Sequence, residues 1–255
     1  MPVQHSPGAA YGWRARIGLL QPGLVSDTNP FEFYMMSPPG VQMVLTSLGL
    51  SSMSNENYER VIASLEIPVQ RLLPRGPDAI IQTGIPPLVY HGWGIEEELR
   101  ARVAKLTPTP YITDAAASIA AMRVLGISRV VVVSAFDDEL ARLIEDYLHH
   151  AGIEMVDHRS VYSDGDYPET GAFPLEFVST TARTVYGSHS DSADGIWITQ
   201  ASLPSVGVIA GLENDLGVPV VTSAQALMWA GLRLAGVSDA VQGCGKLFDI
   251  TAIDY

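Results

Sequence analysis

Asp78-Ala-Ile-Ile-Gln-Thr-Gly-Ile-Pro-Pro-Leu88 opens with an apolar run and then breaks into Thr, Gly and Pro, which is typical of a buried strand ending in a turn. Asp194-Gly-Ile-Trp-Ile-Thr-Gln-Ala-Ser-Leu-Pro-Ser205 has the same order of features in the second half of the chain. Open α/β sheets bind ligands in the crevice beyond the carboxyl ends of their strands. We therefore predict that these two strand ends form opposite walls of one pocket, although either stretch alone would also suit an ordinary strand-to-helix turn.

Short apolar runs alternate with amphipathic stretches along the rest of the chain. Residues 41–48, 130–133 and 218–223 predict further strands, and Ser54 is a suitable N-cap for a helix that carries Tyr58. This alternation predicts an α/β fold with mainly parallel sheets. Because the two strand ends are similar, we expect two similar halves that face each other.

The composition excludes several classes of function. The formal net charge of −13 argues against a nucleic-acid partner, because neutralising phosphates requires clustered Lys and Arg. The single cysteine, Cys244, rules out a disulfide framework and fits a reducing cytoplasm. No apolar run approaches the roughly 20 residues of a membrane span, and the N-terminal segment lacks the apolar core of a secretory signal. We expect a cytoplasmic protein with neither a membrane nor a nucleic-acid partner.

The common cofactor and metal motifs are missing from the sequence. No Gly-x-Gly-x-x-Gly follows a predicted strand, and there is no Walker loop or Gly-x-Ser-x-Gly elbow. Adjacent His149 and His150 point in different directions on a helix, and no His-x-x-x-His or Glu-x-x-His spacing supports a metal site there. Cys244 lies between glycines near Lys246, a setting that can activate a thiol, but a lone cysteine is more often a small buried hydrophobe. We expect neither a cofactor nor a metal.

Several short motifs, spread in order over nearly the whole chain, resemble the aspartate/glutamate racemase superfamily, in the branch of arylmalonate decarboxylase and maleate cis-trans isomerase. They are Ile17-Gly-Leu-Leu-Gln-Pro22, Ser54-x-x-x-Tyr58, Gln82-Thr-Gly84, Leu125-Gly-Ile-x-Arg-Val130, Leu216-Gly-Val-Pro-Val-Val-Thr-Ser223, Gln225-Ala-Leu-x-Trp229, Leu232-Arg-Leu-Ala-Gly236 and Gly245-Lys-Leu-Phe248. The resemblance implies two pseudo-symmetric lobes, each a mainly parallel sheet flanked by helices, with a small-carboxylate site in the cleft between them. It also implies no cofactor and a homo-oligomer. We assign residues 1–112 and 220–255 to the N-terminal lobe and 113–219 to the C-terminal lobe.

The catalytic residues of this superfamily do not carry over intact. Its racemases and maleate isomerases use two cysteines, one at each strand-end motif, whereas arylmalonate decarboxylase keeps only the second, which protonates an enediolate after carbon dioxide leaves. The first position matches Gly84, as in the decarboxylase, and the second matches Gln200, which does not exchange a proton near neutral pH. Ile85 and Pro86 match the hydroxyl-rich hole of the decarboxylase. Because racemisation and thiol addition both need a sulfur, we expect neither reaction unless Cys244 reaches the pocket.

The predicted catalytic residues are Tyr58, His91 and Gln200, where Tyr58 and His91 are the nearest groups able to transfer a proton. The predicted substrate-binding residues flank the two motifs and are Gln21, Pro22, Thr83, Gly84, Ile85, Phe136, Ala201, Ser202 and Ser223. We favour a cofactor-independent enzyme, decarboxylase-like or lyase-like, that acts on a small carboxylate with a non-cysteine acid. A divergent hydrolase or hydratase with His91 or an Asp activating water is one alternative, and a small-carboxylate-binding pseudoenzyme is another. A pocket without a titratable group would favour the pseudoenzyme.

Overall fold

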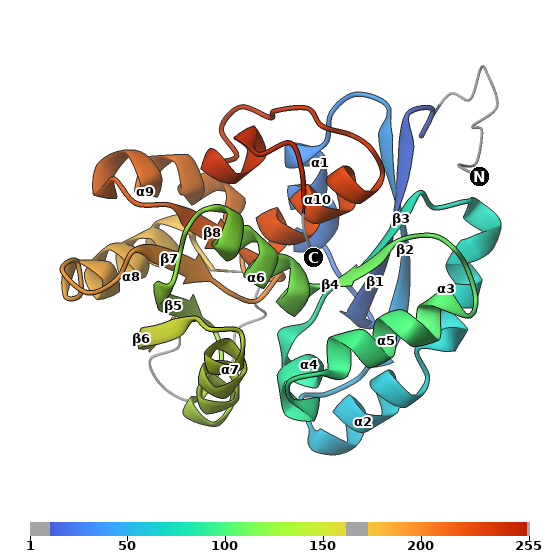
Figure 1. Ribbon diagram of the computed structural model, residues 1–255, viewed down its shortest axis with the longest axis horizontal. Helices are drawn as coiled ribbons and strands as arrows, with labels where there is room; N and C mark the ends of the chain where they lie inside the picture. The colour runs from blue at the N-terminus through green and yellow to red at the C-terminus, as the bar shows by residue number, and fades with distance from the viewer. Residues whose placement is uncertain (1–10, 162–172, 254–255) are drawn as a thin grey trace.

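Two parallel sheets of four strands each form the framework of the chain (Figure 1). The computed structural model describes residues 11–161 and 173–253. The first sheet has the order β2-β1-β3-β4 and the second the order β6-β5-β7-β8, so each strand of one sheet has an equivalent in the other. The strands are β1 (Ala15–Gly23), β2 (Val41–Leu50), β3 (Ala79–Gln82), β4 (Tyr111–Thr113), β5 (Arg129–Ser134), β6 (Glu154–Ser160), β7 (Gly195–Ile198) and β8 (Val220–Thr222). This architecture confirms the predicted α/β fold of two lobes with parallel sheets.

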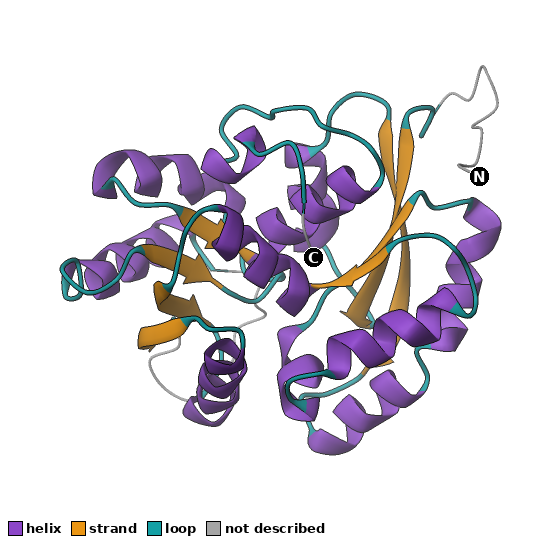
Figure 2. Ribbon diagram, in the orientation of Figure 1, coloured by secondary structure: helices purple, strands orange, loops and turns teal. Residues whose placement is uncertain are grey.

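Helices flank both sheets (Figure 2). They are α1 (Thr28–Met36), α2 (Asn55–Ala63), α3 (Glu66–Leu72), α4 (Ile85–His91), α5 (Ile95–Ala104), α6 (Asp114–Val124), α7 (Asp138–His150), α8 (Leu175–Gly187), α9 (Ile209–Leu216) and α10 (Ser223–Leu234). α7 illustrates how the sequence sets a helix: Asp137 caps it by accepting a hydrogen bond from the Leu140 N–H at 2.9 Å. Its buried residues, among them Leu140, Ile144 and Leu148, lie one turn apart and face the sheet. Within the described ranges, no helix has the length and apolar character needed to cross a membrane.

The central strands are buried on both faces. Every residue of β3 and of β7 is buried, as is Val130–Val133 in β5, which explains why these runs are continuously apolar rather than alternating. All strand pairs are parallel, so the carboxyl ends of β1 and β3 lie at one edge of the first sheet, and those of β5 and β7 at one edge of the second. The predicted strand ends at Gln82 and Ile198 are therefore the two edges from which a shared site can be built.

α6 and α10 lie between the two sheets and join the lobes (Figure 1). α6 follows β4 of the first sheet and contacts β8 of the second, while α10 follows β8 and contacts β3 of the first. Gly231 permits this close approach, because a Cβ there would lie 2.9 Å from Cγ2 of Ile81. The lobes are thus held together by a helix pair rather than by a flexible linker.

Strand β8 corrects one detail of the lobe boundaries expected from the sequence. Residues from 220 onward were assigned to the N-terminal lobe, but Val220–Thr222 pairs with β7 and lies in the second sheet. α10, which begins immediately afterwards, does contact the first sheet. As a division of the whole chain, 1–112 with 220–255 and 113–219 stays a prediction.

Candidate functional site

A cleft with about 440 Å³ of open space lies between the ends of β3 and β7. Its described lining comprises Pro22, Asn29, Leu50, Met53, Thr83, Gly84, Ile85, Pro86, Pro87, Phe136, Gln200, Ala201 and Ser202. It continues into a wider opening of about 850 Å³ that adds Gln21 and the segments around residues 23–26 and 51–52. The structure therefore brings both predicted strand ends to one cleft, together with Gln21, Pro22 and Phe136.

Gly84 and Gln200 occupy equivalent positions in the two lobes and share an unusual backbone conformation. Each is the second residue after its strand, and φ is 109° at Gly84 and 98° at Gln200. Gln200 is the one non-glycine residue with positive φ among those described. Such a conformation costs a residue with a side chain about 1–3 kcal/mol and is often found at functional sites. The fold imposes this conformation twice, but the second lobe places a glutamine side chain there despite the strain.

Three buried polar atoms around the cleft have no hydrogen-bond partner. They are Oε1 of Gln21, Oγ1 of Thr83 and Oε1 of Gln200. The amide nitrogen of Gln21 donates to the carbonyl oxygen of Gly23 at 2.8 Å, and that of Gln200 donates to Oγ of Ser202 at 3.4 Å. Leaving a buried polar atom unpaired costs about 1–3 kcal/mol, which a bound polar ligand would recover. A half-turn of either amide would present N–H groups instead, so these side chains can serve an anionic oxygen or a hydroxyl.

The remaining walls of the cleft are apolar. Leu50 ends β2 and Met53 follows it, Ile85 begins α4, and Phe136 follows β5. Pro86 and Pro87 in the first turn of α4 have no backbone N–H to offer a ligand. Among the described residues, the lining carries no titratable side chain. The cleft is thus a neutral site with a few hydroxyl and amide groups against an apolar surface.

The structure places the other predicted catalytic residues outside the lining. The Tyr58 hydroxyl lies 3.8 Å from Sδ of Met53, so Tyr58 stands directly behind a lining residue. His91 is the last residue of α4, at the end of the helix far from Gly84, and its Nε2 lies 3.7 Å from Oε2 of Glu59. Ser223 is fully buried, and its Oγ accepts a hydrogen bond from the Gln200 N–H at 3.3 Å. It therefore lies behind the cleft wall and supports Gln200 rather than facing the open space.

Cys244 also lies outside the described lining. It is buried, and Sγ lies 3.9 Å from the carbonyl oxygen of Gln242. Its own carbonyl oxygen accepts a hydrogen bond from Nε2 of Gln225 in α10 at 2.6 Å. Burial raises the pKa of the Cys244 thiol, which opposes formation of a reactive thiolate. The neighbouring glycines and Lys246 therefore do not make this cysteine a reactive group.

Glu32, a residue that the sequence did not single out, links α1 to the loop after Gln200. Oε1 of Glu32 accepts hydrogen bonds from the backbone N–H of Ser205 at 2.6 Å and of Val206 at 2.8 Å. Burial raises the pKa of this carboxyl group, and its Oε2 has no partner. Asn29 on the same helix lines the cleft, so Glu32 holds a wall of the first lobe against the second.

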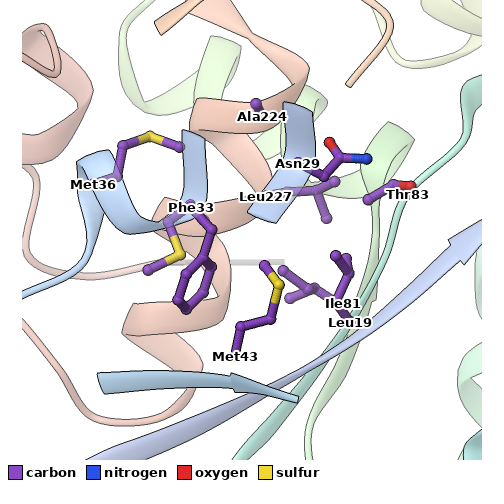
Figure 3. A pocket seen from close by; sticks show the side chains of 10 residues that line it. Leu19, Asn29, Phe33, Met36, Met43, Ile81, Thr83, Ala224 and Leu227 are labelled. Atoms are coloured by element: carbon purple, nitrogen blue, oxygen red, sulfur yellow. The ribbon is translucent and has the colours of Figure 1, made fainter. Parts of the chain in front are cut away.

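A second, smaller pocket opens beside the cleft (Figure 3). It encloses about 270 Å³ between α1, α10 and the first sheet. Asn29 and Thr83 belong to both this pocket and the cleft, and Figure 3 shows them together on one side of it. The other lining residues are apolar: Leu19, Phe33, Met36, Met43, Ile81, Ala224, Leu227 and Met228.

No group of three His, Cys, Asp or Glu side chains suited to a metal occurs in residues 11–161 and 173–253.

Glu96, a half-buried residue of α5, links the two lobes by hydrogen bonds. It accepts hydrogen bonds from Oγ1 of Thr113 at the end of β4 and from the hydroxyl of Tyr147 in α7, the latter at 3.2 Å. Burial raises its pKa from 4.5 to about 7, although the two hydrogen bonds oppose the shift. The folded state therefore binds this proton more tightly than the unfolded state does.

We expect Glu96→Gln to change how stability depends on pH. Because the folded pKa lies above the unfolded one, Glu96 contributes its full stability below pH 4.5 and loses it as the pH rises through 7. The free energy of unfolding of the wild type, relative to that of Glu96→Gln, should fall by on the order of 3 kcal/mol from pH 4.5 to pH 8. Urea unfolding of both proteins at several pH values measures this difference. A difference that stays constant with pH would contradict the prediction.

Comparisons with known proteins place the chain beside two kinds of enzyme. Residues 17–248 match the family model described as arylmalonate decarboxylase. The arylmalonate decarboxylase of Bordetella bronchiseptica is 29% identical over 212 residues, which cover 83% of this chain and 88% of that protein. A crystal structure of arylmalonate decarboxylase has a TM-score of 0.79 at 25% identity and covers 92% of this chain and 99% of its own. Nocardia farcinica maleate cis-trans isomerase, as a cysteine-to-serine mutant with a covalently bound succinylcysteine intermediate, has a TM-score of 0.82 at 24% identity and covers 92% of this chain and 98% of its own.

Proposed function

The chain belongs to the arylmalonate decarboxylase family, and from that premise we propose that it is a cofactor-independent decarboxylase of small malonate-type carboxylates that uses no cysteine. The observation that carries the proposal is the Gln200 side chain, which stands on a strained backbone and lines, together with Gly84, a neutral cleft with an apolar wall. The two relatives differ in the chemistry that their names describe, so the choice between them rests on the residues of this cleft.

Of decarboxylation and cis-trans isomerisation, decarboxylation requires fewer catalytic side chains from the protein. The bond between the central carbon and one carboxylate breaks, carbon dioxide leaves, and the electron pair passes to the remaining carboxylate to form an enediolate. No base takes part in that step, whereas thiol addition requires a nucleophilic sulfur. The succinylcysteine intermediate of the Nocardia farcinica isomerase is such a thiol adduct. Cys244, the single cysteine of this chain, is buried outside the described lining of the cleft, which argues against the isomerase route.

The two sides of the cleft suit the two carboxylates of a malonate. The side chains of Ile85, Pro86 and Phe136 carry no hydrogen-bond donor for a charged group, so a carboxylate held against them loses hydration and is favoured to leave as neutral carbon dioxide. Thr83 and Gln200, with their unpaired atoms, are placed to hold the other carboxylate, on which charge increases as the enediolate forms. Water that enters the cleft then supplies the proton to carbon, because the Tyr58 hydroxyl lies behind Met53 and outside the described lining.

Incubation of the protein with phenylmalonate in D2O, followed by proton NMR, tests the proposal. We expect phenylacetate that carries one deuterium on the carbon next to the ring, because one carboxylate leaves as carbon dioxide and a deuteron from the solvent takes its place on that carbon. Maleate should not be converted to fumarate. Conversion of maleate without cleavage of phenylmalonate would show isomerase chemistry instead.

We expect Cys244→Ser to cleave phenylmalonate at the wild-type rate, within about twofold, since the thiol takes no part. Initial rates at saturating and at low substrate concentrations give kcat and kcat/KM for both proteins. If kcat/KM of Cys244→Ser is lower by two or more orders of magnitude while its thermal stability is unchanged, the thiol takes part in catalysis.

A carboxylate-binding protein without catalysis is the second candidate, and the neutral lining favours it. Calorimetric titration with phenylmalonate separates the two functions, because a pure binding protein would bind the ligand and return it unchanged. The hydrolase alternative relied on His91 or an Asp to activate water. His91 lies at the far end of α4, and no Asp lines the described part of the cleft.

A further inference from the structure

The helix that follows the Gln200 loop (residues 200–205) has no cap of its own. It consists of η3 (Val206–Val208) and α9 (Ile209–Leu216), which follow one another without a break. Ser205, the residue before it, makes no side-chain hydrogen bond to the first turn. The first N–H groups of a helix lack partners within the helix, so when they are buried they need an acceptor from elsewhere. Ser205 and Val206 are both buried, and their N–H groups therefore depend on another part of the chain.

Glu32 of α1 supplies that acceptor from the other lobe. Its Oε1 accepts hydrogen bonds from the N–H of Ser205 at 2.6 Å and of Val206 at 2.8 Å. α1 follows β1 of the first sheet, whereas the capped helix follows β7 of the second, and Ser205 lies 173 residues from Glu32 in the sequence. The two N–H groups and the positive end of the helix compensate the buried charge of the carboxylate. A side chain of the first lobe thus caps a helix of the second.

The Gln200 loop is held at both ends. At its start, the Gln200 N–H donates to Oγ of Ser223 at 3.3 Å. A turn follows, in which the Leu203 N–H donates to the carbonyl oxygen of Gln200 at 2.9 Å. At its end, the Ser205 N–H donates to Glu32. Glu32 is therefore the downstream anchor of the short segment that carries the Gln200 side chain into the cleft.

We propose that Glu32 is a positioning residue that, by capping this helix from α1, fixes the Gln200 loop relative to Asn29 in the cleft. Asn29 lies one turn before Glu32 on α1 and lines the cleft together with Gln200. Glu32 is absent from the described lining, so it acts through the loop and not on the substrate. Without the cap, the loop loses both hydrogen bonds to α1 and can move relative to Asn29. The effect on catalysis rests on the proposed decarboxylase function, whereas the cap itself does not.

Amide hydrogen exchange, measured by NMR as protection relative to the intrinsic rate, tests the proposal without any substrate. Glu32→Ala should lower protection about tenfold or more at Ser205 and Val206, which lose their acceptor. Protection should also fall at Leu203, because its turn is anchored at Ser205. Glu32→Gln should keep protection at these amides within about threefold of the wild type, since its carbonyl oxygen can accept both N–H groups.

Glu213→Ala is the matched control. Glu213 is also a buried glutamate whose carboxylate accepts two backbone N–H groups, from Val220 at 3.1 Å and from Lys246 at 2.9 Å. A loss of protection that comes only from lower overall stability should therefore be similar in the two alanine variants. We expect protection at Ser205 and Val206 to be at least about tenfold lower in Glu32→Ala than in Glu213→Ala.

Phenylmalonate turnover shows whether the anchored loop serves the cleft. We expect kcat/KM to fall about tenfold or more in Glu32→Ala, to recover in Glu32→Gln, and to stay at the wild-type value in Glu213→Ala. Equal protection of the loop amides in the two alanine variants would overturn the proposal, as would wild-type kcat/KM in a Glu32→Ala protein whose loop amides are exposed. If the wild type shows no turnover, the decarboxylase function fails, while the exchange results still decide whether Glu32 fixes the loop.

Discussion

Replacing Gln200 by glycine is expected to make the protein more stable and less active. Glycine adopts the φ of 98° without strain, so the free energy of unfolding should rise by roughly 1 kcal/mol after the greater entropy of unfolded glycine is counted. The side-chain amide that holds the substrate carboxylate is lost at the same time. Removal of one such hydrogen-bonding group typically lowers the rate 10²–10³-fold, and we expect kcat/KM for phenylmalonate to fall by about 100-fold.

Gln242→Gly is the control for this experiment. Gln242 is exposed and has an ordinary φ, so glycine there should lower the free energy of unfolding by up to about 1 kcal/mol and leave the turnover unchanged. Urea unfolding and initial rates on the three proteins give both quantities. If Gln200→Gly is less stable than the wild type and equally active, Gln200 is neither strained nor functional.

Gly84→Ala is expected to damage both stability and activity. Alanine at φ 109° is strained by about 1–3 kcal/mol, and its Cβ would lie 3.0 Å from Cγ of Pro22, which also lines the cleft. The methyl group also enters the space where the substrate binds. We expect the free energy of unfolding to fall by about 2 kcal/mol and kcat/KM to fall at least tenfold.

Gly92→Ala separates strain from obstruction. Gly92 ends the same helix with φ 81°, and a Cβ there would meet nothing within 4 Å. The backbone strain should therefore be similar in the two variants, whereas only Gly84→Ala fills the cleft. The free energy of unfolding should fall by a similar amount in both variants relative to the wild type. The rate of phenylmalonate cleavage should fall in Gly84→Ala alone. If the two variants cleave phenylmalonate at the same rate, Gly84 is not part of the substrate site.

The two strand ends show how far sequence reasoning reaches. Apolar runs that break into Thr, Gly and Pro predict buried strands ending at a ligand-binding edge, and the structure brings Gly84 and Gln200 to one cleft. Local pattern cannot predict that Leu50 and Met53 join them, since these residues come from the end of β2 and the loop after it, which long-range packing brings to the cleft. His91 was chosen for its closeness in sequence, but the two turns of α4 carry it away from Gly84.

Asp114 is a residue whose position the sequence indicates only when the two halves of the chain are compared. It follows the short strand β4 and is the first residue of α6, where either Thr113 or Asp114 could cap the helix. Thr113 caps the helix, accepting a hydrogen bond from the Ala116 N–H at 3.3 Å, and the Asp114 carboxylate instead accepts a hydrogen bond from the Gly84 N–H at 3.3 Å. The similarity of Ile112-Thr-Asp-Ala115 to Val221-Thr-Ser-Ala224 marks the two helix starts as equivalent. Comparison of the two halves, rather than of single motifs, identifies Asp114 and Ser223 as equivalent positions.

The central claim is that a carboxylate binds between Gly84 and Gln200. A crystal structure with phenylacetate, the product that the protein cannot cleave further, tests it most directly. We predict density in the cleft, with the carboxylate within hydrogen-bond distance of Thr83 Oγ1 and the Gln200 side chain, and with the ring against the apolar wall. An empty cleft with the ligand bound elsewhere at high occupancy would contradict the claim.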